Sequence, residues 1–168
     1  MKSKFKYVSC VCLVLSLFLT LGCLSACNNA TLDSKDFLVS VTDLSATEQQ
    51  FALANKADST AYVRFDVILT WQSESDSSRV YAASPVRDTD YTISLSDGII
   101  EIGDFFYVCS PIDTETAVDM IKVTYLANAP EGFRLGVKIL PDAISAEYPD
   151  QMSSVWGVTV DSNGNIQK

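Results

Sequence analysis

The sequence predicts an all-β protein: a single antiparallel β-sandwich, of jelly-roll or immunoglobulin-like type. Apolar and polar residues alternate with a period of two in several segments, which is the pattern of strands with one face in a core. Short polar connections that contain turn residues separate these segments, and helical periodicity is scarce. Periodicity alone leaves both sandwich topologies open.

The N-terminal segment differs from the rest of the chain and has the pattern of a signal peptide. Lys2, Lys4 and Lys6 precede an apolar run from Val8 to Leu21. A run of about 14 residues is typical of a signal peptide and is shorter than the ~20 residues that span a bilayer. An uncleaved membrane anchor is the alternative.

This segment ends in a lipobox, Leu24-Ser25-Ala26-Cys27. We expect a signal peptide over residues 1–26, cut between Ala26 and Cys27, and a diacylglyceryl group on the sulfur of Cys27. Cys23 is a weaker candidate because the two residues before it fit a lipobox less well. The interpretation places the protein at the cell membrane, lipid-anchored on the extracytoplasmic face.

A short polar segment follows the modified cysteine. Residues 27–35 are therefore interpreted as the lipidated cysteine and a tether, which would span on the order of 25 Å when extended. Residues 36–168 are interpreted as the β-sandwich domain. Loss of residues 1–26 leaves 142 of the 168 residues, which is enough for one hydrophobic core.

The charge and the residue types exclude several classes of function. The processed chain holds 9 basic and 21 acidic residues, a net charge of −12, which disfavours nucleic acid as a partner. Histidine is absent, and this excludes Ser-His-Asp and Cys-His catalysis and nearly all catalytic zinc sites. Cys109 remains as a single cysteine in an apolar run, and we interpret it as a buried hydrophobic residue.

Two segments show the strand pattern most clearly. In Ala61–Trp71 the odd positions are all apolar, and Phe133–Leu140 repeats this alternation. Arg64 and Asp66 share the opposite face of the first segment, which predicts that this face is solvent-exposed or an interface. The further predicted strands are Phe37–Val41, Gln50–Asn55, Tyr91–Leu95, Ile99–Cys109 with a bend near Gly103, Val118–Leu126 and Val155–Val160.

The end of the chain predicts a hairpin, with a turn at Asn163-Gly164. Pro149 is a candidate opening for one helical turn within residues 147–154. The longest connection, Gln72–Arg79, is polar and predicts a mobile loop.

Oxygen-bearing side chains suggest candidate sites, but simpler explanations compete with each of them. Two sets of Asp and Asn residues carry oxygens that could bind calcium. Neither set has the spacing of a calcium-binding loop or its terminal glutamate, so a role in turns explains them better. These groups are Asp88, Asp90 and Asp97, and Asp161, Asn163 and Asn165. Other carboxylates could form acid/base pairs by chance in so acidic a chain: Glu74, Asp76, Asp113, Glu115 and Asp119. We expect no metal, no cofactor and no catalytic residue.

The aromatic residues of the strands present a similar choice between a ligand-binding groove and the core. Their places in alternating segments favour core packing. They are Trp71, Trp156, Phe65, Phe105 and Tyr107.

Taken in order, the strand segments resemble the TasA/camelysin family of secreted β-sandwich proteins, the biofilm-fibre subunits of Gram-positive bacteria. The matching pieces are Asn55 with the stretch Ala61–Trp71, Phe105-Phe106-Tyr107 with Pro111 and Thr114, and Ile139–Ala146 with Val155–Val158. The resemblance implies a jelly-roll-like sandwich and assembly into extracellular fibres, in which an N-terminal strand completes the sheet of a neighbour.

This chain departs from that pattern at two places. A lipobox stands where the fibre subunits carry an ordinary signal, and Ile112-Asp113 follow Pro111 where the family's turn has glycine. The resemblance therefore favours a non-enzymatic surface lipoprotein that assembles, anchors or accompanies a matrix fibre or other cell-envelope proteins by strand addition. The alternative is a surface lipoprotein that binds a carbohydrate or a peptide. An enzyme is the third possibility, disfavoured by the absent histidine.

Overall fold

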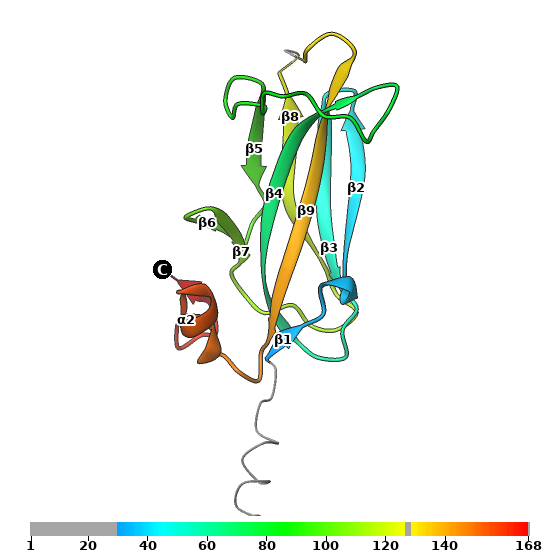
Figure 1. The fold of residues 1–168 in the computed structure, drawn as a ribbon. Helices are drawn as coiled ribbons and strands as arrows, with labels where there is room; N and C mark the ends of the chain where they lie inside the picture. The colour runs from blue at the N-terminus through cyan, green and yellow to red at the C-terminus, as the bar shows by residue number, and fades with distance from the viewer. Residues whose placement is uncertain (1–29, 127–128, 168) are drawn as a thin grey trace, which may run out of the picture.

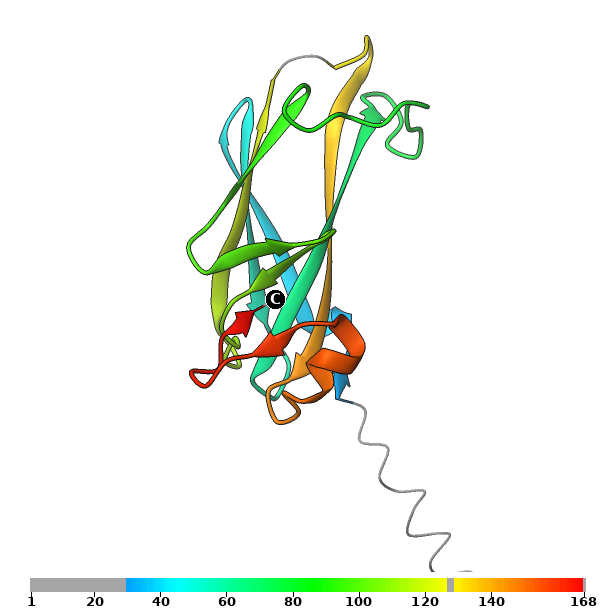
Figure 2. The same cartoon turned by 90° about the vertical axis from the view of Figure 1, so that its left-hand side faces the viewer.

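The computed structural model describes residues 30–126 and 129–167, which form two antiparallel sheets packed face to face as a sandwich (Figures 1 and 2). The five-stranded sheet has the order β1 (Thr31–Leu32), β9 (Phe133–Ser145), β4 (Ala61–Ser73), β7 (Phe105–Val108) and β6 (Ile99–Ile102). The four-stranded sheet has the order β2 (Phe37–Ser45), β3 (Glu48–Asn55), β8 (Ala117–Tyr125) and β5 (Tyr91–Leu95). The all-β sandwich expected from the sequence is confirmed.

The longest ladder joins β4 to β9, the two strands with the clearest alternation. They pair along their full lengths, from Ala61 opposite Ser145 to Ser73 opposite Phe133. The odd residues of β4 point into the space between the sheets, where Phe65 is fully buried and stacks on Phe106 with ring centroids 5.4 Å apart. The period-two pattern thus reports the buried face directly.

Strand β9 is longer than predicted because it continues through Pro141 to Ser145. Proline cannot donate to a ladder and is tolerated where a strand has no second neighbour. Strand β1 pairs only with Ala143 and Ile144, so β9 has no described partner on that side at Pro141.

The tether predicted over residues 27–35 differs from the structure in its described part. Ala30 is buried, and Thr31–Leu32 form β1 against β9. The chain then makes a short 3-10 helix, η1 (Ser34–Asp36), whose first turn is capped by Asp33, before it enters β2. The fold therefore begins before residue 36, because backbone pairing with β9 holds these polar residues.

Two other segments also differ from the prediction. Residues 99–109 form the hairpin β6–β7, which turns at Gly103 with a positive φ of 63°, rather than one bent strand. Residues 155 and 156 belong to the helix α2 (Gln151–Trp156), which ends at Gly157 in the left-handed conformation. Only β10 (Thr159–Val160) of that predicted strand is extended. The apolar residues Val155 and Trp156 fit a short amphipathic helix as well as a strand.

The C-terminal segment builds a second hydrophobic cluster on the outer face of the five-stranded sheet. The strands β10 and β11 (Ile166–Gln167) form the predicted hairpin, with Gly164 at positive φ in its turn. Together with α2, they cover Tyr62, Tyr107 and Ile144. The lower part of this sheet is therefore buried on both faces, whereas its upper part is buried on one (Figure 1).

Candidate functional site

One side of the sandwich is open in both sheets. Strand β2 is the edge of the four-stranded sheet and pairs only with β3. Strand β9 pairs with β4 along its whole length, but on its other side it meets only the two residues of β1. Both edges lie on the right-hand side of Figure 1. The backbone of residues 133–142 therefore has no described strand beside it on that side.

The gap, which is the space beside β9 where no described strand lies, reaches the interior of the sandwich, as the side chains of β2 show. Val39 and Val41 pair with Leu53 and Phe51 of β3, which are core residues, so they share the core face. Nevertheless, Val39 is 37% exposed and Val41 is 54% exposed. A strand placed beside β9 would face them. Within the described residues no strand occupies this place, although η1 also contacts β9.

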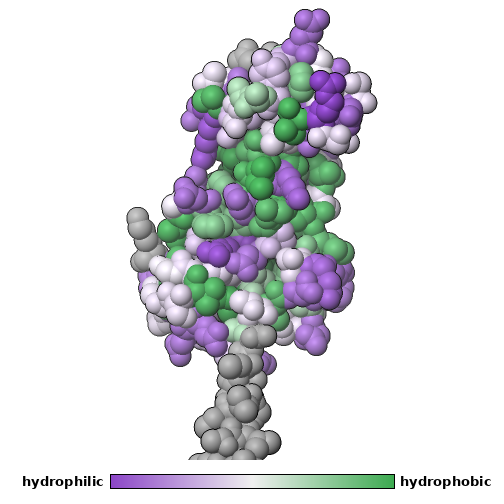
Figure 3. All heavy atoms as spheres, viewed as in Figure 1, coloured by the Kyte–Doolittle hydropathy of each residue, from purple (hydrophilic) through white to green (hydrophobic). Residues whose placement is uncertain are grey.

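Apolar side chains also occur on the outer faces of both sheets near this open side. Leu38 and Leu44 of β2 are more than half exposed, and Ile68 of β4 and Leu140 of β9 are about 40% exposed. Figure 3 shows hydrophobic residues gathered over the middle of the outer face of the five-stranded sheet, where β4 and β9 run. Natural edge strands commonly carry lysine or proline that blocks pairing; β2 has neither, and in β9 they occur at Lys138 and Pro141, so residues 133–137 are without them. The chemistry of β2 and of residues 133–137 of β9 therefore favours the addition of another strand.

A cavity of about 620 Å³ lies where the open side reaches the end of the sandwich far from β1. The ends of β2, β3, β4 and β8 and the start of β9 surround it, so it opens between the two sheets. Its volume is in the range of ligand sites. Its lining includes Asp43, Gln49, Trp71, Glu74, Tyr125 and Phe133.

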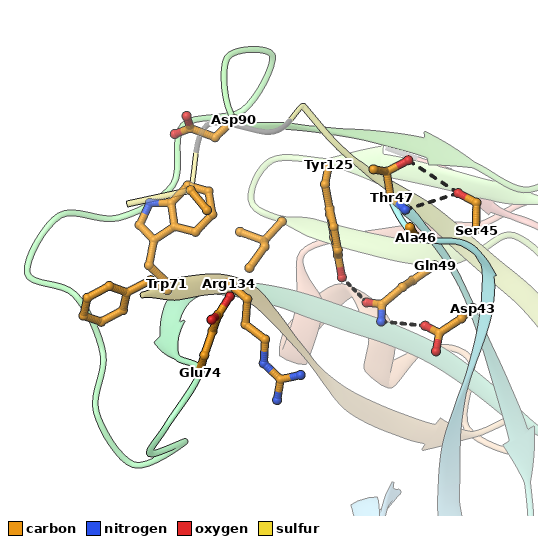
Figure 4. Close-up of a pocket in the computed structure, with 13 residues that line it drawn as sticks. Asp43, Ser45, Ala46, Thr47, Gln49, Trp71, Glu74, Asp90, Tyr125 and Arg134 are labelled. Atoms are coloured by element: carbon orange, nitrogen blue, oxygen red, sulfur yellow. Dashed lines mark hydrogen bonds between the residues drawn. The ribbon is translucent and has the colours of Figure 1, made fainter. Parts of the chain in front are cut away.

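A chain of hydrogen bonds runs along one wall of this cavity (Figure 4). The hydroxyl of Tyr125 donates to Oε1 of Gln49, and Nε2 of Gln49 donates to Oδ1 of Asp43 at 2.8 Å. Burial is the main cause that raises the pKa of Tyr125, and the nearby carboxylate of Asp43 adds to it. The hydroxyl therefore stays protonated at neutral pH and keeps the chain of bonds oriented.

In each of the two groups considered for calcium, one aspartate side chain holds a turn. Oδ1 of Asp161 accepts hydrogen bonds from the backbone N–H groups of Asn163 and Asn165, and these bonds lower the pKa of Asp161. Oδ2 of Asp90 accepts from the N–H of Val86. Within residues 30–126 and 129–167, no three acidic or cysteine side chains are grouped as metal ligands.

The other carboxylates that we considered are distributed over several loops. Asp76 accepts from Ser78, Asp113 accepts from Thr60, and Glu115 forms an ion pair with Lys56. Glu74 lines the cavity, and Asp119 lies in β8. Their partners are hydroxyl, amide or ammonium groups, which is the arrangement of structural turns.

The aromatic residues occupy the core, as predicted, with one exception. Phe65, Trp71, Tyr107 and Trp156 are buried, whereas Phe105 is partly exposed. Tyr107 and Trp156 pack edge to face in the second cluster. Trp71 belongs to the main core and also reaches the cavity.

The face that Arg64 and Asp66 share is covered at Arg64. The side chain of Arg64 is only 17% exposed, and its guanidinium lies 4.3 Å from the ring centroid of Phe105 and 5.0 Å from that of Trp156. Its Nε and Nη2 atoms both donate to Oδ2 of Asp142 at 2.9 Å. The expectation of a solvent-exposed or interface surface is thus wrong here, because the C-terminal helix packs on this part of the strand.

Cys109 is the one cysteine within the described residues, and it is half-buried. Burial raises the pKa of its thiol, so the reactive thiolate is disfavoured at neutral pH. The predicted lipidation site, Cys27, lies outside the described residues. No helix among residues 30–126 and 129–167 has the length and apolar character needed to span a bilayer.

Sequence reasoning missed the cavity and the open side. A cavity between two sheets depends on how far their ends diverge, which periodicity does not report. The signal for the open edge was present in β2, where Leu38 and Val39 are adjacent and both faces carry apolar residues.

The fold and the site define an antiparallel β-sandwich with an open side and a cavity at its end. In comparisons with family models, with curated proteins and with solved structures, none matches this chain.

Proposed function

We propose that this protein is a non-enzymatic, lipid-anchored lipoprotein of the cell surface that assembles with matrix-fibre or other cell-envelope proteins by accepting a strand. The observation that carries the proposal is the stretch 133–142 of β9, which pairs with β4 on one side and has no described strand on the other, opposite the exposed inner-face residues Val39 and Val41. A strand beside β9 would satisfy free N–H and C=O groups and cover apolar surface. The resemblance to biofilm-fibre subunits supports the same assignment.

The direction of the chain supports an anchoring or accessory role. The chain enters the fold at β1, and the cavity lies at the opposite end of the sandwich (Figure 1). A diacylglyceryl group on Cys27 would hold the β1 end near the membrane and leave the other end accessible. The alternative function, binding of a carbohydrate or peptide ligand, is favoured by the cavity itself.

The variant Val41→Lys tests strand addition. It should weaken binding of an extended peptide by about tenfold or more, because a charged side chain would stand in the gap beside the incoming strand. We expect the free energy of unfolding to change by less than about 1 kcal/mol, since Val41 is 54% exposed and the lysine head can reach water.

The measurement uses the full chain purified from membranes in a non-ionic detergent, titrated with a ten-residue acetylated and amidated peptide of alternating threonine and valine. The matched control is Leu95→Lys, which puts the same charge on β5, the other edge of the four-stranded sheet. Retained binding in Val41→Lys, or equal loss in both variants, would contradict the proposal.

The anchor is tested separately with Cys27→Ala. Without the sulfur, lipid transfer and the cleavage that depends on it should both fail, so an unlabelled precursor that still carries Lys2 should accumulate. Metabolic labelling with a fatty-acid analogue and intact-mass measurement report these two outcomes. Continued labelling of the variant would mean that another cysteine is modified.

A further inference from the structure

The cavity at the end of the open side has an acidic lining, and this charge selects among occupants. Asp43, Glu74 and Asp90 line it, against one basic residue, Arg134. No ion pair joins Arg134 to these three within residues 30–126 and 129–167. Three carboxylates against one guanidinium leave a net charge of −2 on the lining. The complementary occupant is a cation.

One of these carboxylates is held in place before any ligand arrives. Oδ1 of Asp43 accepts from Nε2 of Gln49, which itself accepts from the hydroxyl of Tyr125. This leaves Oδ2 of Asp43 to accept from a ligand without first reorganising the wall. Preorganised acceptors reduce the entropy that binding costs.

The aromatic residues around the cavity favour an aliphatic stem over a sugar ring. Trp71 is only 5% exposed, so its ring face is not open to a flat ligand. The ring of Phe133 meets that of Tyr81 edge to face, with centroids 5.1 Å apart. A long side chain can pack its methylenes along such edges while its charged head stays near the rim.

The position of the cavity connects it to the open side. Phe133 and Leu135 of β9 line it, and so does Asp43 near the end of β2. An extended segment beside residues 133–142 of β9 would therefore end at the cavity. We propose that the cavity binds a lysine or arginine side chain at the end of the incoming strand. This inference rests on the proposed function and adds the chemistry of the partner.

The test compares peptides and variants with the full chain in a non-ionic detergent. The threonine–valine peptide is made in four forms, with lysine or norleucine at either its first or its last position. The two positions cover the two directions in which the peptide could lie beside β9. One lysine peptide should bind about fivefold more tightly than its norleucine counterpart. The double variant D43N/E74Q should remove this preference. Its asparagine retains Oδ1 as the acceptor for Gln49.

The control D58N/E147Q removes the same charge from a surface depression lined by Asp58, Thr60 and Glu147, and it should keep the preference. A lysine preference that is absent, or that survives in D43N/E74Q, would overturn the inference while strand addition stands. If no peptide binds, strand addition fails, and the cavity is then tested alone with N-acetyl-lysinamide.

In that titration, the indole N–H signal of Trp71 in NMR spectra should shift for the unmodified chain and not for D43N/E74Q. A shift in neither protein would overturn the proposal for the cavity. A shift with methyl glucoside in place of the lysine compound would overturn the choice of a cation in favour of a sugar.

Discussion

Replacing Asn55 with alanine should lower the free energy of unfolding by about 3 kcal/mol, because it leaves several buried polar groups without partners. Asn55 is fully buried at the end of β3. Its Nδ2 donates to the carbonyl groups of Ser59 and Ile112, each at 2.9 Å, and its Oδ1 accepts from the N–H of Ala57 at 2.9 Å. One side chain therefore satisfies the turn between β3 and β4 and ties it to the loop after β7.

Denaturant unfolding followed by circular dichroism measures this change. The control Asn163→Ala removes the same amide from an exposed turn, where we expect an effect below about 0.5 kcal/mol. A loss of less than about 1 kcal/mol for Asn55→Ala would mean that water or a rearranged loop replaces these bonds. The hydrogen bonds of Asn55 thus assign it to closing a turn.

Replacing Asp142 with alanine should cost about 2 kcal/mol and loosen the C-terminal segment from the sheet. Oδ2 of Asp142 accepts from the guanidinium of Arg64 and from Nε1 of Trp156, the latter at 2.9 Å. Without it, a nearly buried cation and an indole N–H lose their common acceptor. The side chain of Asp142 is 42% exposed, so solvent replaces part of the loss and keeps the cost moderate.

Two readouts separate this effect from a general loss of stability. The indole N–H signal of Trp156 in NMR spectra should move, and limited proteolysis should cut the chain sooner after residue 146. Asp142→Asn retains an acceptor and should show about half the loss. Asp150→Ala serves as a control, because this exposed residue before α2 makes no side-chain capping bond. Unchanged protease resistance in Asp142→Ala would show that apolar packing alone holds the segment.

The contacts of Arg64 with Asp142 and Trp156 also affect the proposed assembly. Here α2 and the C-terminal hairpin cover the lower part of the five-stranded sheet, whereas its upper part remains uncovered (Figure 2). An incoming strand would therefore meet the edge of β9 rather than the face beneath α2. Strand addition uses the free edge of β9, whereas the side chain of Asp142 contacts Arg64 and also Trp156 of the C-terminal cover, so the Val41 and Asp142 variants should act independently.

The sequence alone predicts the strands well where one face is buried. The alternation in Ala61–Trp71 reports its core face, and Tyr91–Leu95 matches β5 in both bounds. It predicts less where a segment is short and apolar throughout, as at Val155-Trp156, because helix and strand bury such residues equally well. It also assigned Ala30–Lys35 to a tether, since two-residue pairing with β9 leaves no periodic signal.

What the sequence determined by itself is the class of fold, the absence of histidine chemistry and the prediction of a lipid anchor at Cys27. These follow from local patterns and from which residue types are present. The tertiary structure decided that β2 and residues 133–142 of β9 stay open on one side, that Arg64 is enclosed, and that a cavity with an acidic lining lies at the end of the gap. These depend on which strands become neighbours and how far the sheets separate, and such long-range geometry leaves no local pattern in the chain.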